Sequence, residues 1–99
     1  MSTICDIGEL ITRDPKVRGG KPCIAGTSVS VRRIVGWYKM GESAEEIARE
    51  YPQVSLAQVY AALAYYHANY QELENVFRVE EQEEERLLTE DRKRSGRDP

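Results

Sequence analysis

Few side chains in this 99-residue chain could carry out catalysis. His67 is the only histidine, and its place between aromatic residues is more typical of a core or interface position than of a general base. Cys5 and Cys23 lack the spacing of a metal or redox site, so we expect free thiols. Glu45 and Glu46 are adjacent and would point to different parts of a helix surface. We therefore predict no enzymatic activity, no metal and no cofactor.

A glycine-rich segment, Arg18-Gly19-Gly20-Lys21, has some features of a phosphate-binding loop. Proline follows Lys21 where such a loop requires serine or threonine, and no glycine stands five residues before Gly20. The segment therefore predicts a turn, and the alternative is an anion-binding nest of backbone amides.

The charge is unevenly distributed along the chain. A net charge of −3 excludes a uniformly basic nucleic-acid-binding surface. Residues 1–70 hold 8 basic and 7 acidic residues, whereas residues 71–99 hold 6 and 10. Five glutamates lie between Glu80 and Glu85, and the chain becomes basic after Asp91. We predict a folded module over 1–70, followed over 71–99 by an acidic helical extension with a basic, disordered tail.

The sequence shows no sign of export or membrane insertion. Its longest apolar run, Val59–Tyr66, is far shorter than the roughly 20 residues of a membrane span. The first residues lack the basic flank and the apolar stretch of a secretory signal. We expect a cytoplasmic protein that does not bind a membrane.

Short strands are predicted before the first helix. Leu10–Arg13 is typical of a strand that ends at Asp14-Pro15, because the residue before proline favours extended geometry. Cys23-Ile24 and Thr27–Val31 flank Ala25-Gly26, which predicts a β-hairpin. A lone two-stranded ribbon is marginally stable, so the hairpin must pack on helices or pair with a second copy. We expect its edge to form a homodimer.

Three helices are predicted in the folded module. The first carries an apolar stripe from Val31 to Tyr38 and ends at Gly41. The second and third each begin with a capping box, in which two side chains each accept a hydrogen bond from the other residue's backbone amide. The capping pairs are Ser43 with Glu46 and Ser55 with Gln58, and Val54 and Val59 flank the second pair as a hydrophobic staple.

The third helix is predicted to extend beyond the module. Apolar residues repeat every three or four positions from Leu56 to Phe77, with no glycine or proline, so we predict a helix that continues through residue 70. Leu73, Val76 and Phe77 then need another surface to cover them. We predict a partner protein there, and the alternative is that this apolar seam folds back on the hairpin.

These elements predict a mainly α fold, a trihelical, homeodomain-like helix-turn-helix core preceded by a short β-hairpin. The third helix would enter the major groove, where Gln58 alone could pair with an adenine edge, although capping is its other role. No lysine or arginine occurs from residue 50 to residue 77, which argues against strong binding by a monomer. The candidate phosphate contacts are three basic side chains and the backbone amides near two serines: Arg32, Arg33, Lys39, Ser43 and Ser55. Arg32 and Arg33 could equally be solvated residues of the helix surface.

Two blocks of residues between positions 10 and 70 resemble domain-of-unknown-function family 433. They comprise Ile11–Pro15, Gly19–Pro22, Ile24 and Gly26-Thr27, and then Gly41, Ser43, Glu46-Ile47, Tyr51-Pro52 and Ala62–Tyr66. The resemblance implies a homeodomain-like helix-turn-helix core behind a β-hairpin. It also implies a homodimeric, cytoplasmic antitoxin of VapB type that neutralises a PIN-like ribonuclease toxin and represses its own operon.

The extension and the resemblance together suggest how a toxin would be bound. The apolar, acidic helix would lie along the toxin, and Arg92, Lys93 and Arg94 would reach its metal-binding carboxylates. Arginine suits that contact because its guanidinium forms bidentate pairs. The alternative function is a dimeric protein–protein interaction module with no nucleic-acid binding. Under that alternative, replacing Arg32 and Arg33 with alanine leaves function intact.

Overall fold

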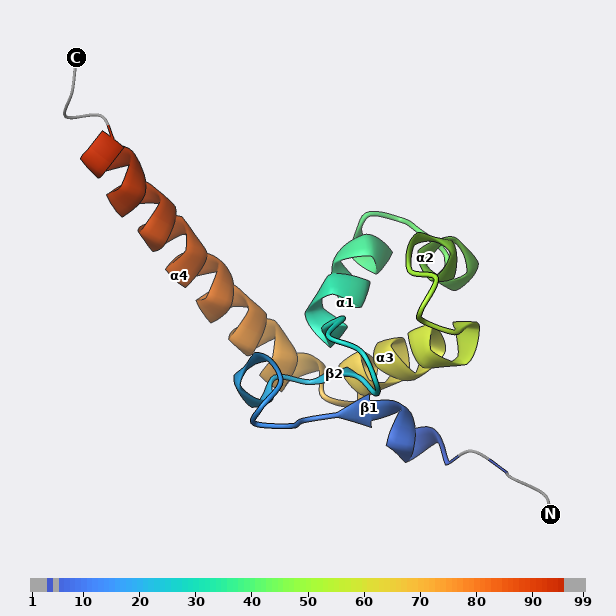
Figure 1. Cartoon of the computed structure of the whole chain (residues 1–99). Coiled ribbons are helices and arrows are strands. Elements are labelled where there is room, and N and C mark those ends of the chain that lie inside the picture. The colour runs from blue at the N-terminus through green and yellow to red at the C-terminus, as the bar shows by residue number, and fades with distance from the viewer. Residues whose placement is uncertain (1–3, 5, 96–99) are drawn as a thin grey trace. The chain divides into compact units, whose positions relative to one another are not determined.

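The structure is a computed structural model that describes residue 4 and residues 6–95. It is mainly helical, as predicted, with a short two-stranded antiparallel sheet (Figure 1). The chain divides into a first unit, Met1–Ala68, and a second unit, Asn69–Pro99. The first unit contains η1 (Ile7–Leu10), β1 (Ile11–Thr12), η2 (Arg18–Gly20), β2 (Cys23–Ile24), α1 (Val31–Lys39), α2 (Ala44–Glu50) and α3 (Leu56–Ala68). The second unit contains α4 (Tyr70–Ser95). Cys5 lies outside the described residues.

Helix α3 is the centre of the first unit. It packs against α1, α2, η1 and both strands (Figure 1). A helix that is covered on several sides must be apolar on several faces. The alanine-rich and aromatic-rich sequence of α3 meets this requirement, and its buried residues are Val59, Ala61, Ala62, Leu63 and Tyr66. Ile34 and Val35 of α1 and Ile47 of α2 complete the core around it.

Both predicted capping boxes are confirmed. The Glu46 amide donates to Ser43 Oγ (3.1 Å), and the Ser43 amide donates to Glu46 Oε1 (2.8 Å). At the start of α3, the Gln58 amide donates to Ser55 Oγ (3.1 Å) and the Ser55 amide donates to Gln58 Oε1 (2.9 Å). Each box satisfies two backbone donors that the first helical turn leaves without partners. Local sequence therefore fixes where α2 and α3 begin.

The end of α1 is also set locally. Gly41 has a φ of 97°, in the left-handed region that favours glycine. The Gly41 amide donates to the Tyr38 carbonyl (3.0 Å), and the Glu42 amide donates to the Trp37 carbonyl (3.2 Å). These two bonds form a Schellman motif, which satisfies carbonyls at the helix end. Tyr38, the last residue of the predicted apolar stripe, is partly exposed.

The strands pair differently from the prediction. β1 pairs antiparallel with β2, with Ile11 opposite Ile24. The predicted hairpin around Ala25-Gly26 is reduced to a single bridge between Cys23 and Ser30. The sheet partners are therefore joined by the long segment that contains η2, and not by the tight turn that the sequence favoured.

The hydrogen bonds of Thr27, in the turn that follows β2, explain this difference. The Thr27 amide and hydroxyl both donate to the Ile24 carbonyl (3.1 and 2.9 Å), and the Thr27 hydroxyl accepts from the Val29 amide (3.0 Å). Gly26 has a φ of 77°. Thr27 takes part in this turn, and α1 already begins at Val31. Too few extended residues therefore remain between them to form the predicted strand Thr27–Val31.

The predicted continuous helix is interrupted at Asn69. α3 ends at Ala68 and α4 begins at Tyr70. The Leu73 amide donates to the Asn69 carbonyl (2.9 Å), so Asn69 occupies the N-cap position of α4. Asparagine favours such positions because its short amide competes for backbone hydrogen bonds. The apolar spacing continues across Asn69, but the helix does not. The prediction of one helix through residue 70 is therefore wrong, because apolar spacing does not show where a helix is interrupted.

Helix α4 carries hydrogen bonds and ion pairs between residues three or four positions apart. Arg86 forms ion pairs with Glu83 and with Glu90, and its Nη1 lies 2.7 Å from Glu90 Oε1. The Thr89 hydroxyl donates to the Glu85 carbonyl (2.9 Å). Ion pairs at this spacing support an exposed helix locally. Among the helices of the described residues, none is both long and apolar enough to span a bilayer.

Candidate functional site

The side chain of Gln58, predicted to read a base, is engaged within the protein. Its Oε1 accepts from the Ser55 amide, and its Nε2 donates to the Ala25 carbonyl (3.3 Å). The amide therefore connects the start of α3 to the turn after β2. A bidentate contact to adenine uses the same two atoms, and each of them already makes a hydrogen bond that fixes the orientation of the amide toward the protein.

Three other residues near the start of α3 offer no hydrogen-bonding group that is free to meet a base edge. Ala61, one of the first residues of this helix, is buried against the core. Leu56 and Tyr60 are exposed instead. The Tyr60 hydroxyl donates to Glu45 Oε2 of α2 (3.3 Å), and the negative charge of Glu45 raises the pKa of Tyr60. This face repels phosphate at Glu45 and offers apolar contact elsewhere.

The predicted phosphate contacts are not gathered at one place. Arg32 and Arg33 lie in the first turn of α1, and Lys39 is its last residue, which is about 10 Å further along the axis. The Lys39 ammonium lies 5.8 Å from the centroid of the Tyr66 ring. The hydroxyls of Ser43 and Ser55 already accept capping hydrogen bonds. Of this set, Arg32 and Arg33 are consecutive residues.

The predicted partner surface on α4 is partly accessible. Leu73 is 2% exposed, so the expectation that it stays uncovered is wrong. Val76 is 40% exposed, and Phe77 is half-buried. Two leucines that the prediction omitted, Leu87 and Leu88, are 52% and 61% exposed. They lie beyond the glutamate run, where the regular apolar spacing had lapsed, so periodicity alone did not reveal them.

The basic end of α4 is described only in part. Arg92 and Lys93 are exposed helical residues. Arg94 belongs to the helix, and its side chain lies outside the described part of the structure. The tail that was predicted to be disordered is therefore helical as far as Ser95.

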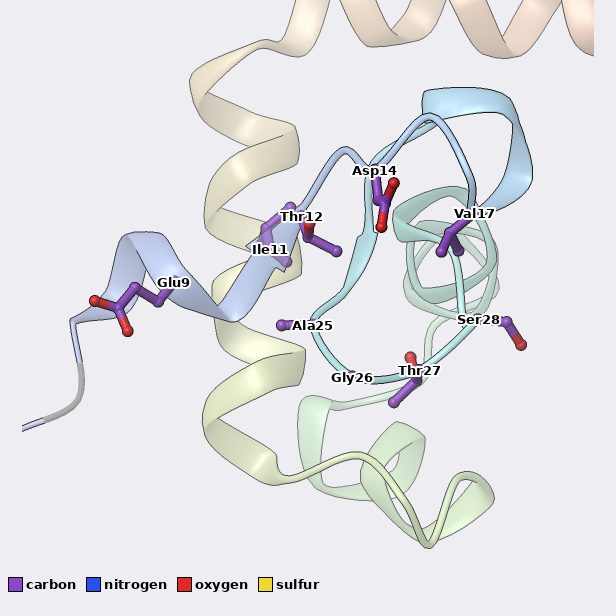
Figure 2. A pocket seen from close by; sticks show the side chains of 9 residues that line it. All are labelled: Glu9, Ile11, Thr12, Asp14, Val17, Ala25, Gly26, Thr27 and Ser28. Carbon is purple, nitrogen blue, oxygen red and sulfur yellow. The ribbon is translucent and has the colours of Figure 1, made fainter.

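An open depression of about 740 Å³ lies between β1, the segment after it and the turn after β2 (Figure 2). Its lining residues are Glu9, Ile11, Thr12, Asp14, Val17, Ala25, Gly26, Thr27 and Ser28. Asp14 and Thr27 lie on opposite sides of it in Figure 2. Asp14 Oδ1 accepts from the Lys16 amide (2.9 Å), and the Thr27 hydroxyl is held by backbone groups. These polar groups stabilise turns.

The remaining candidates for chemistry are Cys23 and His67. Cys23 is buried and free, and desolvation raises the pKa of its thiol despite the nearby charge of Arg18. His67 is exposed beside two aromatic rings, with centroid distances of 5.6 Å to Tyr38 and 5.1 Å to Tyr66, so a core position for it is wrong. Within the described residues, no three His, Cys, Asp or Glu side chains are grouped as metal ligands.

Comparison with known proteins gives a family for this fold. The model of the family described as "Protein of unknown function (DUF433)" matches residues 11–66, which is more than half of the chain. The chain belongs to the DUF433 family. The match runs from β1 to Tyr66 in α3, so DUF433 membership is established on the first unit, and α4 lies outside it.

A solved DUF433 structure is similar to this chain. It is the crystal structure of a DUF433 member protein from Anabaena variabilis ATCC 29413, with 27% sequence identity and a TM-score of 0.62. The similarity covers 68% of this chain and 66% of that chain, so it spans about two thirds of the Anabaena protein. No curated protein matches this DUF433 chain.

Proposed function

We propose that this DUF433 protein is the antitoxin of a type II toxin–antitoxin pair and that it binds and neutralises a PIN-like ribonuclease. In this proposal the protein is a cytoplasmic homodimer, α1–α3 form a homeodomain-like helix-turn-helix, and operator DNA is a second ligand. The observation that carries the proposal is the accessible apolar surface of α4.

That surface belongs to a unit that, in the described residues, is one helix. A single helix cannot enclose its own apolar side chains, and its stability in proteins comes mostly from packing of an apolar face. Val76, Leu87 and Leu88 are nevertheless exposed. An amphipathic helix with such residues is typical of segments that lie in a groove of a partner protein.

The charge of α4 supports a nuclease as that partner. Five of the six residues from Glu80 to Glu85 are glutamates, and residues 81–93 are exposed throughout. A ribonuclease must attract a polyanion, so the surface around its active site is positively charged. A glutamate-rich helix fits that surface, and it competes with RNA for it.

The basic end of the helix would complete the inhibition. Arg92 and Lys93 follow the glutamate run, and they are exposed. In a PIN-like nuclease the metal ions are held by carboxylates, so a cation there competes with the metal. Arginine is the better competitor because its planar fork pairs with a carboxylate through two hydrogen bonds.

The homodimer is proposed at the outer edge of β1. The two-stranded sheet pairs β1 with β2 only, and such an edge pairs readily with another chain. A depression of about 380 Å³ with mainly apolar walls lies beside it. Its lining residues are Ile7, Gly8, Ile11, Ala61, Ala64, Tyr65 and Ala68.

The test is inhibition of RNA cleavage by the purified nuclease, with the full chain as inhibitor. The double variant Leu87→Gln, Leu88→Gln removes the apolar contacts of α4 without changing its charge, and we expect inhibition to weaken at least about 100-fold. The matched control is Met40→Gln, which changes an exposed apolar residue of the first unit, and it should inhibit like the parent protein. Equal inhibition by the double variant and the parent would contradict the proposal.

A second candidate function is a dimeric interaction module that binds no nucleic acid. The engaged side chain of Gln58 and the exposed Leu56 and Tyr60 favour it, because they make α3 a better protein contact than a DNA reader. A protein of this kind would show no salt-dependent binding to duplex DNA. The measurement described below therefore separates the two functions.

A further inference from the structure

Positive charge in the first unit is concentrated in one segment. Residues 13–33 hold six basic residues and one acidic residue, whereas residues 34–68 hold two basic and four acidic residues. The near-neutral total of the module hides this separation. A surface built from residues 13–33 is therefore basic, although α2 and α3 are not.

The fold brings two of these basic residues to adjoining positions. The end of β2 runs antiparallel to the residues that lead into α1. The Val31 amide donates to the Pro22 carbonyl (2.9 Å) and fixes this pairing. Lys21 precedes Pro22, and Arg32 follows Val31. These two basic residues therefore lie next to the paired residues, on segments that run side by side, and Arg33 is the next residue of α1.

Arg18 is tied to the same region. Its Nε donates to the Ser28 carbonyl (2.6 Å), two residues before the N-cap of α1. The loop reaches this position through left-handed backbone at Arg18, Gly19 and Gly20, whose φ angles are 51°, 65° and 87°. Arg18, Lys21 and Arg33 are exposed, and Arg32 is half-buried. We call these four residues, Arg18, Lys21, Arg32 and Arg33, the basic face.

The first turn of α1 adds to the positive potential of the basic face. It contains two arginines and no acidic residue, and the positive end of the helix dipole lies there. A polyanion that binds at this end releases condensed counterions.

We propose that the basic face binds the phosphate backbone of double-stranded DNA. Residues 13–33 contain no Phe, Tyr or Trp, so this segment offers no aromatic platform on which single-stranded bases could stack. Gln58 and Ala61 of α3 are not available to read base edges. The contact is therefore with phosphates, and the inference rests on the operator-binding part of the proposed function but not on nuclease neutralisation.

The test is fluorescence anisotropy of a labelled duplex with the full chain at about 50 and about 200 mM salt. The double variant Lys21→Gln, Arg33→Gln should bind at least about tenfold more weakly and reduce the salt slope by about 2. The charge-conserving double variant Lys21→Arg, Arg33→Lys should bind like the parent. The matched control Arg49→Gln, Arg78→Gln removes two exposed charges of α2 and α4 and should also bind like the parent.

Several results would overturn the inference. One is an equal loss of duplex affinity in Lys21→Gln, Arg33→Gln and in the control variant. Another is tighter binding of a single-stranded RNA than of the duplex through the same residues. A third is the absence of salt-dependent duplex binding by the parent protein. Conversion of a dimer to a monomer by Lys21→Gln, Arg33→Gln, without duplex binding, would assign the basic face to a second copy. Nuclease inhibition measured on the same variants should stay unchanged, so a failure here is distinguishable from a failure of the neutralisation proposal.

Discussion

The two units of this protein are helical for different reasons. In the first unit, capping boxes set where α2 and α3 begin, and burial of Ile34, Ile47 and Val59 holds the helices together. In the second unit, α4 is supported along its length by contacts within one helix, such as those of Arg86 with Glu83 and Glu90. Local contacts suffice to make a helix, but they leave apolar side chains exposed. This difference is the basis for proposing that the second unit, rather than the first, binds the partner.

The largest effect that separates the two units is expected from apolar truncation. Ile47 is fully buried, so Ile47→Ala should lower the free energy of unfolding by about 2–5 kcal/mol through lost burial and a cavity. Leu87→Ala in α4 should change it by less than about 0.5 kcal/mol, because Leu87 is exposed. Urea unfolding followed by the fluorescence of Trp37, the single tryptophan, measures both. Similar losses in the two variants would remove the contrast between the units.

A medium effect is expected from a pair of glutamines. Gln58→Ala removes one half of a capping box and the hydrogen bond to Ala25, and should cost about 1–2 kcal/mol. Gln82→Ala, at an exposed position of α4, should leave stability unchanged. The same Trp37 titration compares them. If Gln58→Ala matched Gln82→Ala, the side chain of Gln58 would have no structural role and would be available for DNA.

The smallest effect is expected from acid titration. The Ser43 amide and hydroxyl lower the pKa of Glu46, and the guanidinium of Arg86 lowers the pKa of Glu83. A carboxyl with a lowered folded-state pKa stabilises the fold above its ordinary pKa of 4.5, and that stabilisation is lost as the pH falls below it. Glu46→Gln should remove part of the acid sensitivity of the Trp37 transition. Glu83→Gln should instead change only the acid dependence of helicity in far-UV circular dichroism.

Much of the first unit could be predicted because its signals are local. Ser43, Ser55 and Gly41 mark helix ends by interactions that span only a few residues, so spacing in the sequence suffices to find them. The strand pairing was predicted incorrectly because Cys23-Ile24 could pair with the residues on either side, and the turn at Thr27 left only β1.

The candidate functional residues were harder to predict because the role open to each side chain depends on the atoms that the fold places beside it. The residue type and position of Gln58 suit a base contact, but in the fold its amide donates to the Ala25 carbonyl. Arg18 and Lys21 belong to a turn in the sequence, and they become part of a basic face only because the chain returns past them at Ser28 and Val31. The clustering of charge in residues 13–33 was the available signal.

The amino-acid sequence by itself determined the helices of the first unit, the starts of α2 and α3, the end of α1 and the charge of each segment, because propensity, capping and composition are properties of neighbouring residues. Only the tertiary structure decided which strands pair, that the Gln58 amide bonds to the Ala25 carbonyl, and which side chains of the first unit remain accessible. Those outcomes depend on contacts between residues far apart in the chain, where several pairings satisfy the same local pattern and the free energy of packing selects one of them.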